Sequence, residues 1–419
     1  MLNSVKLFIL CSLSFFILQN RLEAQDLRHL FSEYKYEYLQ YDSCYLESYG
    51  DNKNFDKFYS KLEKLNFTGE GQISILHLGG SHIQAGIWSW QMRKNFENMM
   101  PGMEGAPGLV FPFSIAKTNH PFYYTSKIEG EWEFERITDK EPKIDIGLSG
   151  ITAFTEDSIA SIIISFNSVS EIHKHKFDKY SVFHNLEDTT WLLKVKPENL
   201  LDTIIVNFDI GASEFYFKEK LDSVQIYISK KDSCETKFYF YGAYLENSEP
   251  GINYSAVGIN GASTTSYLKA DLFEQHLKAV NPDLVILSIG VNDAAGKNFK
   301  ESVYIENYKK IIDKILNISP DCAILLTTNN DFYYYRGGVN PFSSEIYRSM
   351  KTLANFYGAS LWNLYRVMGG QKSINLWRKD ELANKDRIHF TRDGYIVVAD
   401  LLFDAIIKDF AEFLQKSKK

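Results

Sequence analysis

Cysteine is scarce in this chain, with 4 among 419 residues, and their wide spacing fits none of the usual metal-binding patterns. A positive net charge is also missing. The chain has 46 Lys and Arg against 53 Asp and Glu, so its formal net charge is −7 at pH 7. This acidic balance gives no sign of a nucleic-acid partner. No internal repeat or low-complexity tract is visible, and 45% hydrophobic residues argue against disorder. The composition therefore indicates a soluble globular protein large enough for two cores.

The first apolar stretch, Leu7 to Leu18, is too short to span a bilayer, which takes about 20 residues. Lys6 precedes it, and Ala24 provides a small residue for cleavage before Gln25. We therefore expect a signal peptide over residues 1–24 and an exported protein, periplasmic or extracellular at the cell surface, with no integral membrane segment after its removal. A retained signal anchor is the alternative.

Three cysteines follow the expected cleavage point: Cys44, Cys234 and Cys322. Their odd number leaves at least one thiol unpaired or pairing between chains. Cys322 opens the apolar run 322–326, so we expect it to be an inert residue of the core.

The pattern of apolar runs changes twice along the chain. Ile73–Leu78 is typical of a strand that runs into two glycines and a helix over 83–100, after mixed helical turns over 25–70. Regularly spaced short runs over 115–250, such as 130–134, 161–166, 203–208, 224–228 and 237–241, predict an all-β sandwich or jelly roll. Beyond residue 250, strands expected at 283–289, 322–328 and 359–364 alternate with helices expected at 264–280, 302–318, 343–356 and 395–416. This alternation predicts a parallel sheet with helices on both faces.

Ser81 lies where the first strand ends in Gly79-Gly80 and a helix begins. The glycines tolerate unusual backbone angles and leave room for a substrate, and the helix start offers free N–H groups. A serine at this point can act as nucleophile and as oxyanion donor, although alone it is more often a helix N-cap.

Asp386 and His389 stand three residues apart, immediately before Phe390 and a turn. On one loop this spacing allows the carboxylate to hydrogen-bond Nδ1 of the imidazole and to turn Nε2 toward a nucleophile. A surface Asp that caps the last helix beside a half-buried His is the alternative interpretation.

Two further segments offer hydrogen-bond donors. Asn292 follows Gly290 at the end of an apolar strand, and Gly261 lies in a loop of small residues, Gly258 to Ser263, that leads into a helix. A side-chain amide and an unobstructed backbone N–H at such positions can both donate to an oxyanion. Either segment can also be an ordinary turn.

In this order the four segments resemble the SGNH hydrolases, also called the GDSL family. The resemblance implies Ser81 as nucleophile, Asp386 and His389 as its acid-base partners, and an oxyanion hole made by Ser81, Gly261 and Asn292. It covers roughly residues 71–120 and 251–412. One departure is Gly80, since the family block usually has Asp beside the serine; His82 on the other side is a candidate to take over some of that role.

The runs Gly108–Pro112, Ala116–Asn119 and Tyr241–Tyr244 are similar to exported bacterial peptidoglycan O-acetylesterases, in which a carbohydrate-binding-like β module interrupts the hydrolase fold. The fold class expected is therefore α/β, a flavodoxin-like three-layer SGNH domain with an inserted all-β sandwich or jelly roll. The expected divisions are a signal peptide (1–24), a helical lead-in (25–70), a first hydrolase segment (71–114), the inserted β-sandwich (115–250) and a second hydrolase segment (251–419).

The implied reaction is acyl transfer from an O-acetylated glycan, peptidoglycan first, to water through a Ser-His-Asp site, with no metal or cofactor. His77, His82 and His120 lack the spacing of metal ligands, and we expect His77 to face the sheet interior. Candidate substrate-binding residues are His82, Asn260, Asp293, Asn330 and Arg336. The last two flank Tyr333–Tyr335, whose rings can stack on sugars.

Three other functions stay open at this point. The same residues can pass acetate to a sugar hydroxyl if water is excluded, which makes an O-acetyltransferase acting on cell-wall or exopolysaccharide sugars. The second alternative is a non-catalytic glycan-binding protein that keeps the shape of the site. It is less favoured, because a protein that only binds has no physical need for Ser81, Asp386 and His389 together. A lipase is less favoured, because the segments around Ser81 and His389 are mixed rather than apolar.

Overall fold

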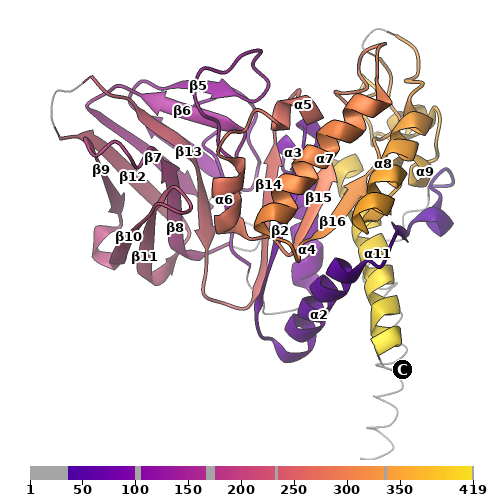
Figure 1. The fold of residues 1–419 in the computed structure, drawn as a ribbon, viewed down its shortest axis with the longest axis horizontal. Coiled ribbons are helices and arrows are strands. Elements are labelled where there is room, and N and C mark those ends of the chain that lie inside the picture. Colours follow the sequence, from indigo (N-terminus) through magenta and orange to yellow (C-terminus); the bar gives the residue numbers. More distant parts are fainter. Residues whose placement is uncertain (1–35, 100–104, 167–174, 232–234, 335–336, 418–419) are drawn as a thin grey trace, which may run out of the picture. The chain divides into compact units, whose positions relative to one another are not determined.

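A six-stranded sheet forms the centre of the α/β region in the computed structural model, which describes residues 36–99, 105–166, 175–231, 235–334 and 337–417. The strand order is β1-β17-β16-β15-β2-β14 (Figure 1). β1 is antiparallel to β17, and all other neighbours are parallel. The bounds are β1 Leu46–Ser48, β2 Gln72–Gly79, β14 Gly251–Gly258, β15 Leu284–Ser288, β16 Ala323–Thr327 and β17 Ser360–Trp362.

The parallel strands are apolar along most of their length because helices cover both of their faces. Leu284 to Leu287 of β15 are all fully buried. In chain order the five parallel strands follow the doubly wound order 2-1-3-4-5, whose switch point lies between the first and third strands. Here these are β2 and β15, so ligands are expected where these two strands end.

The helices form two groups. α2 (Lys53–Thr68), α4 (Ile87–Met99) and α11 (Arg392–Ser417) make up one group, in which α11 contacts both α2 and α4. α6 (Phe273–Val280), α7 (Glu301–Ile318) and α8 (Ser343–Tyr357) make up the other group, and Figure 1 shows α7 and α8 in front of β15 and β16. The short helices are α3 Ser81–Gln84, α5 Thr264–Tyr267, α9 Leu364–Val367, α10 Ser373–Lys379, η2 Tyr41–Ser43 and η3 Glu198–Leu200. None of the helices described has both the length and the apolar character to cross a membrane.

The strands between residues 108 and 246 make two antiparallel sheets. One follows the order β10-β11-β8-β13-β6-β5, with β3 also paired to β13, and the other follows β4-β7-β12-β9. Ile162 and Ile226 of the smaller sheet share one buried cluster with Phe238 and Phe240 of the larger. The bounds are β3 Gly108–Val110, β4 Thr125–Glu129, β5 Glu133–Arg136, β6 Ile151–Thr155, β7 Ile159–Ser165, β8 Phe177–His184, β9 Trp191–Lys196, β10 Leu201–Asn207, β11 Ala212–Leu221, β12 Ser223–Lys230 and β13 Phe238–Glu246.

Most elements lie where the sequence predicts them, with three differences. The expected helix over 83–100 is α3 and α4, separated at Gly86, whose φ is +76°. The expected helix over 264–280 is likewise α5 and α6. Within the expected helical lead-in, α2 is a helix, but Leu46–Ser48 are the edge strand β1, because their backbone pairs with β17.

The domain divisions stay a prediction. Residues 37–419 form one compact unit, in which β3 joins the larger antiparallel sheet although it precedes residue 115. The expected signal peptide, Cys234 and Arg336 lie outside the described residues. Cys322 is buried, as expected, and burial raises the pKa of its thiol.

Candidate active site

Ser81 is the first residue of α3, directly after β2 and Gly79-Gly80. The turn is tightly packed. A Cβ at Gly79 would lie 2.3 Å from the Ile83 side chain, so only glycine fits there. Because β2 is the first strand of the doubly wound order, the turn places Ser81 at the switch point of the sheet.

Ser81, His389 and Asp386 form one hydrogen-bonded series, although Ser81 and His389 are 308 positions apart. Ser81 Oγ lies 2.8 Å from His389 Nε2, and His389 Nδ1 lies 2.7 Å from Asp386 Oδ2. The His389 and Asp386 side chains are 34% and 39% exposed, so the series is open to solvent on one side. This is the arrangement needed for a serine to pass its proton to an imidazole that a carboxylate orients.

The Asp386 carboxylate is fixed by its own loop. Its Oδ1 accepts from the N–H groups of Ile388 and His389 at 2.9 and 3.0 Å. Burial alone would raise the pKa of Asp386, but the hydrogen bonds from the His389 side chain and from these two N–H groups outweigh burial and hold the pKa below its usual value. Asp386 is therefore ionised at neutral pH.

The loop that carries both residues is held from two sides. Arg387, between them, has a left-handed backbone with a φ of +57°, and its carbonyl accepts from the N–H of Tyr333 at 3.0 Å. Asn384 N donates to the His389 carbonyl at 2.8 Å, and Asn330 Nδ2 donates to the Ile388 carbonyl at 2.9 Å. Asn330 thus holds the loop in place.

The candidate oxyanion donors gather around Ser81. Among the described residues, no hydrogen bond uses the N–H of Ser81 or of Gly261, so both are free to donate to an oxyanion. Asn292 Nδ2 donates one hydrogen to the Ala262 carbonyl at 2.9 Å and keeps the other. Gly261 has a φ of +83°, which a residue with a side chain rarely adopts.

Gly80, in place of the usual Asp, faces the Asn292 amide. A Cβ at Gly80 would lie 3.2 Å from Asn292 Nδ2 and 3.5 Å from the Ala262 carbonyl. The glycine therefore leaves space beside the amide that is a candidate oxyanion donor.

His82 is buried behind the site rather than open to it. Its Nδ1 is hydrogen-bonded to the Tyr395 hydroxyl at 3.0 Å, and its ring centroid lies 5.2 Å from that of His389. Burial, with the nearby charge of a protonated His389, lowers the pKa of His82 to about 3, so the ring is neutral at neutral pH. His82 packs against His389 and does not occupy the place of the missing Asp.

A cavity of about 570 Å³ opens over Ser81. Of the candidate substrate-binding residues, Asn260 lines it, whereas His82, Asp293 and Asn330 do not. Asp293 instead accepts from the N–H and hydroxyl of Thr264 at the start of α5, at 3.1 and 2.5 Å, and burial raises its pKa. The lining consists of Ser81, Ala85, Ile87, Asn119, Asn260, Gly261, Val291, Asn292, Ala295, Phe332, Tyr333, Tyr334, Asn384, Ile388, His389, Phe390 and Tyr395.

The sequence does not predict that Gln84 and Asn119 lie at the site. It also does not predict the hydrogen bonds that Asn119 makes with Gln84 and Asn260. Gln84 is buried one turn after Ser81 and is hydrogen-bonded to Thr118, Asn119 and Asn260. Ala116–Asn119 stands out in the sequence as a family-like run, but nothing in that run indicates a contact with residue 260.

His77 is a buried histidine with two hydroxyl partners rather than a metal ligand. It is fully buried in β2, as expected, with its nitrogens 2.9 Å from the Tyr254 hydroxyl and 2.8 Å from the Ser288 hydroxyl. Within the described stretches of the chain, no group of three or more His, Cys, Asp or Glu side chains is placed to hold a metal ion.

Residues 229–397 match the model of the GDSL-like lipase/acylhydrolase family. The chain carries a GDSL-like acylhydrolase domain. This match contains Gly261, Asn292, Asp386 and His389 of the hydrolase but not Ser81, which precedes the two antiparallel sheets in the sequence. No curated protein matches the sequence.

The hydrolase is also similar to solved structures, one of them over most of its length. A structure described as a peptidoglycan O-acetylesterase in action has a TM-score of 0.71 and 23% identity, over 88% of this chain and 99% of the other. A putative acylhydrolase from Bacteroides fragilis has 18% identity over 38% and 76% of the two chains, with a TM-score of 0.29. A family two carbohydrate esterase from Cellvibrio japonicus has 12% identity over 69% and 100%, with a TM-score of 0.28. The first similarity shows that the two chains share a mixed α/β fold with a largely parallel sheet.

Proposed function

We propose that this hydrolase is an exported esterase that removes O-acetyl groups from a glycan, most directly peptidoglycan. The observation that carries the proposal is the hydrogen-bonded series from Ser81 through His389 to Asp386 at the cavity that Gly261 and Asn292 also line. Peptidoglycan is chosen because the structure that shares this overall fold is described as a peptidoglycan O-acetylesterase. Export is inferred from the N-terminal sequence.

In the proposed reaction, Ser81 Oγ attacks the acetyl carbonyl carbon while its proton passes to His389 Nε2. Asp386 stabilises the imidazolium, and the N–H groups of Ser81 and Gly261 with the Asn292 amide donate to the oxyanion. Collapse of this intermediate expels the sugar oxygen, which takes the proton from His389, and leaves acetyl-Ser81. Water then attacks the acetyl group, gives its proton to His389, and acetate leaves as Ser81 regains its proton.

The test is acetate release from O-acetylated peptidoglycan, comparing the protein without residues 1–24 with its Ser81→Ala variant. The esterase proposal predicts a loss on the order of 10³-fold or more in kcat for the variant. Equal release by both proteins would refute it. Transfer of acetyl to an added glycan in preference to water would identify an acetyltransferase, and glycan binding with no turnover would identify a binding protein.

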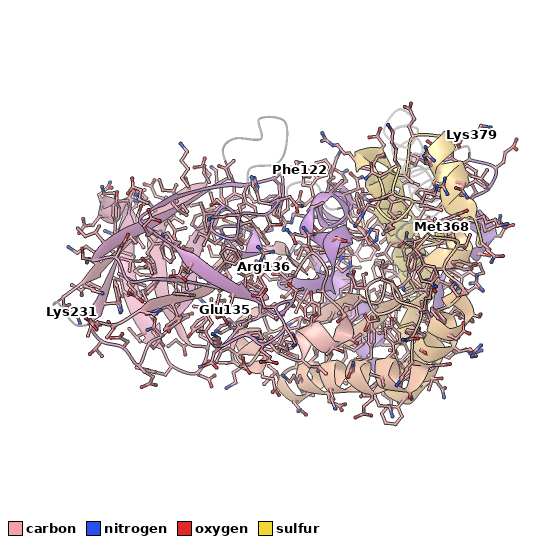
Figure 2. The ribbon with its side chains drawn as sticks, turned by 90° about the horizontal axis from the view of Figure 1, so that it is seen from above. Phe122, Glu135, Arg136, Lys231, Met368 and Lys379 are labelled. Atoms are coloured by element: carbon pink, nitrogen blue, oxygen red, sulfur yellow. The ribbon has the colours of Figure 1, made fainter. Side chains whose placement is uncertain are left out.

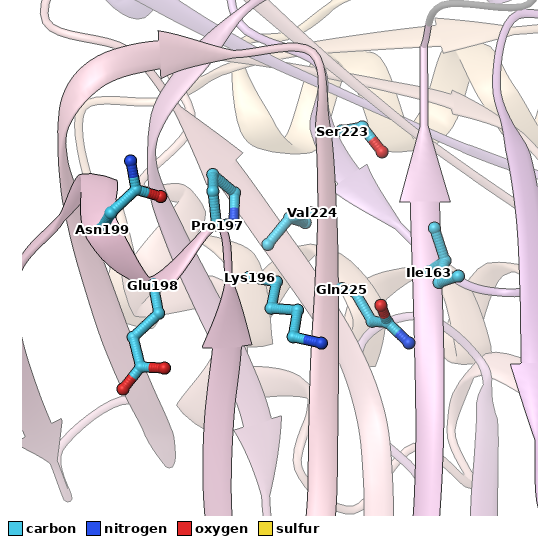
Figure 3. A pocket seen from close by; sticks show the side chains of 8 residues that line it. All are labelled: Ile163, Lys196, Pro197, Glu198, Asn199, Ser223, Val224 and Gln225. Carbon is cyan, nitrogen blue, oxygen red and sulfur yellow. The ribbon is translucent and has the colours of Figure 1, made fainter.

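The proposal includes glycan contact by the antiparallel sheets. A second, larger groove of about 850 Å³ lies on β9, β12 and β7, away from Ser81 (Figure 3). Lys196 Nζ donates to the Tyr227 hydroxyl at 2.9 Å, and that hydroxyl donates to Gln225 Oε1 at 2.7 Å. Lys196 and Gln225 line the groove, and polar groups such as these can hydrogen-bond sugar hydroxyls. In the Ser81→Ala background, replacing the lining residue Gln225 by Ala should weaken binding to insoluble peptidoglycan, and unchanged binding would remove this groove from the proposal.

A further inference from the structure

The aromatic part of the cavity wall that a ligand can reach consists of Tyr333 and Tyr334. Phe332, Phe390 and Tyr395 also line the cavity, but all three are buried in the core. Tyr333 and Tyr334 line it as well and are half-buried, so part of each side chain is open to the cavity.

The Tyr333 side chain is held at its base, on one face and at its hydroxyl. Its backbone N–H donates to the Arg387 carbonyl at 3.0 Å, and the Arg387 guanidinium lies over its ring, 4.8 Å from the centroid. Its hydroxyl accepts from Asn375 Nδ2 at 2.7 Å. By contrast, the Tyr334 side chain has no hydrogen bond or ring contact among the described residues. Tyr333 therefore presents a fixed ring with one covered face.

The helix that holds the hydroxyl of this ring is itself anchored. Asn375 lies in α10, and the N–H of Ile374 in the same helix donates to Asp331 Oδ2 at 3.1 Å. The N–H of Asp331 donates to Met368 Sδ at 3.0 Å. Figure 2 labels Met368, which precedes α10, and Lys379, which ends it. Because the ring is fixed before a ligand arrives, stacking on it loses little free energy to ordering the side chain.

Tyr333 lies on the side of the cavity that the leaving sugar must occupy. In the proposed reaction the sugar oxygen takes its proton from His389 Nε2, so the sugar lies next to the loop that carries His389. Tyr333 is joined to that loop through Arg387. The candidate oxyanion donors Gly261 and Asn292, which would hold the acetyl oxygen, come from other segments of the wall. Tyr333 is thus placed to contact the sugar rather than the acetyl group.

We infer that Tyr333 is a specificity-determining residue whose ring stacks on the sugar ring that carries the acetyl group. A pyranose ring has a face of C–H groups that packs on an aromatic ring, whereas an open-chain polyol has no fixed face of this kind. The inference rests on the proposed esterase function.

Arg387 is the positioning residue for Tyr333. Its φ of +57° is one that glycine adopts without strain and other residues rarely adopt, so its side chain is not there to suit the backbone. The guanidinium covers one face of the Tyr333 ring and fixes the direction of the other.

The test measures kcat/KM for three acetyl esters: O-acetylated methyl glucoside, O-acetylated sorbitol, which has similar hydroxyls but no ring, and ethyl acetate. The wild-type protein should prefer the glucoside to the sorbitol ester. Tyr333→Leu keeps an apolar side chain but loses the ring, so it should reduce this preference by about 10-fold, whereas Tyr333→Phe should keep most of it.

Tyr45→Leu is the matched control. Tyr45 is exposed and has the guanidinium of Arg366 over its ring at 5.1 Å, but it does not line the cavity. The control should keep the wild-type preference. Loss of the preference in Tyr45→Leu as well would show that the effect does not come from the cavity wall and would overturn the inference.

Arg387→Gly separates the side chain from the backbone, because glycine keeps the left-handed φ. It should reduce the preference for the glucoside by a larger factor than it reduces kcat for ethyl acetate, and Arg387→Lys, which keeps a cation, should retain part of the preference. A purely structural role in the loop would instead lower kcat/KM for all three esters by the same factor, and that result would overturn the assignment of Arg387.

The failure of this inference differs from the failure of the proposed function. If Tyr333→Leu keeps the wild-type preference, or the wild-type protein hydrolyses the esters without preferring the glucoside, the inference is overturned and the esterase proposal stands. If the wild-type protein hydrolyses none of the three esters, both are overturned.

Discussion

Replacing Asp386 by Asn tests whether the carboxylate orients His389, because the structure separates its two oxygens by task. Oδ1 accepts from two backbone N–H groups, and Oδ2 lies 2.7 Å from His389 Nδ1. In Asp386→Asn the amide oxygen can keep both backbone contacts, while the amide NH₂ faces Nδ1. The imidazole must then carry its proton on Nε2, where it cannot accept the proton of Ser81.

We expect kcat for para-nitrophenyl acetate to fall by about 10³- to 10⁴-fold, equivalent to about 4 to 5.5 kcal/mol in the activation barrier. Because the Asp386 side chain is 39% exposed, the free energy of unfolding should fall by only about 1 kcal/mol or less. Steady-state kinetics and denaturant unfolding of the same preparation measure both. An Asn variant within 10-fold of wild-type kcat would refute the assignment of Asp386. A Ser81→Ala/Asp386→Asn double variant should be no slower than Ser81→Ala, since the residues act as a unit.

Three further changes give distinct results. Asn292→Ala should lower kcat by about 10²- to 10³-fold, because it removes a candidate oxyanion donor. Its Tm should change little, because the Asn292 side chain makes one hydrogen bond to the protein. A kcat within threefold of wild type would contradict this prediction. Gly258→Ala should lower both kcat and Tm, since the new Cβ would lie 2.2 Å from the Gln84 backbone nitrogen; unchanged Tm would contradict the packing. Burial lowers the pKa of His77 and of His276 to about 3, whereas each has a pKa of 6.5 in the unfolded chain. Between these two values the unfolded chain binds more protons than the folded protein does. The free energy of unfolding should therefore fall by about 1.4 kcal/mol per pH unit for each histidine as the pH drops below 6.5. His276→Gln should reduce that slope by about one proton in pH-dependent denaturant unfolding, and an unchanged slope would contradict its neutral burial.

The parallel sheet can be predicted from the sequence because its strands are buried runs that a local pattern reveals. The proximity of Ser81, Asp386 and His389 can be predicted as well, since each lies in a short motif next to a strand or helix end, while their catalytic roles stay a prediction. The pairing of β14 with β2 cannot, because the strands are separated in sequence by two whole antiparallel sheets. The strand β1 cannot be predicted either, because three residues are too few for the alternating pattern of a strand to be recognised. It lies within a segment that the sequence predicts to be helical.

The positions of the substrate-binding candidates are harder to predict than those of Ser81, Asp386 and His389. Asp293 follows Asn292 and looks equally available in the sequence, yet its carboxylate is taken up by Thr264, which is 29 positions away. Gln84 carries no motif, and its contacts with residues 35 and 176 positions away exist only in the folded chain. Side-chain amides have no sequence period, so their partners depend on tertiary packing alone.

The central claim, that Ser81 forms the acyl-enzyme, is tested most directly by acid quenching during turnover of para-nitrophenyl acetate, followed by peptide mass mapping. We expect an acetyl group on the peptide that contains Ser81 and its absence in Ser81→Ala. An acetyl group on another residue, or acetate release by Ser81→Ala at the wild-type rate, would contradict the account.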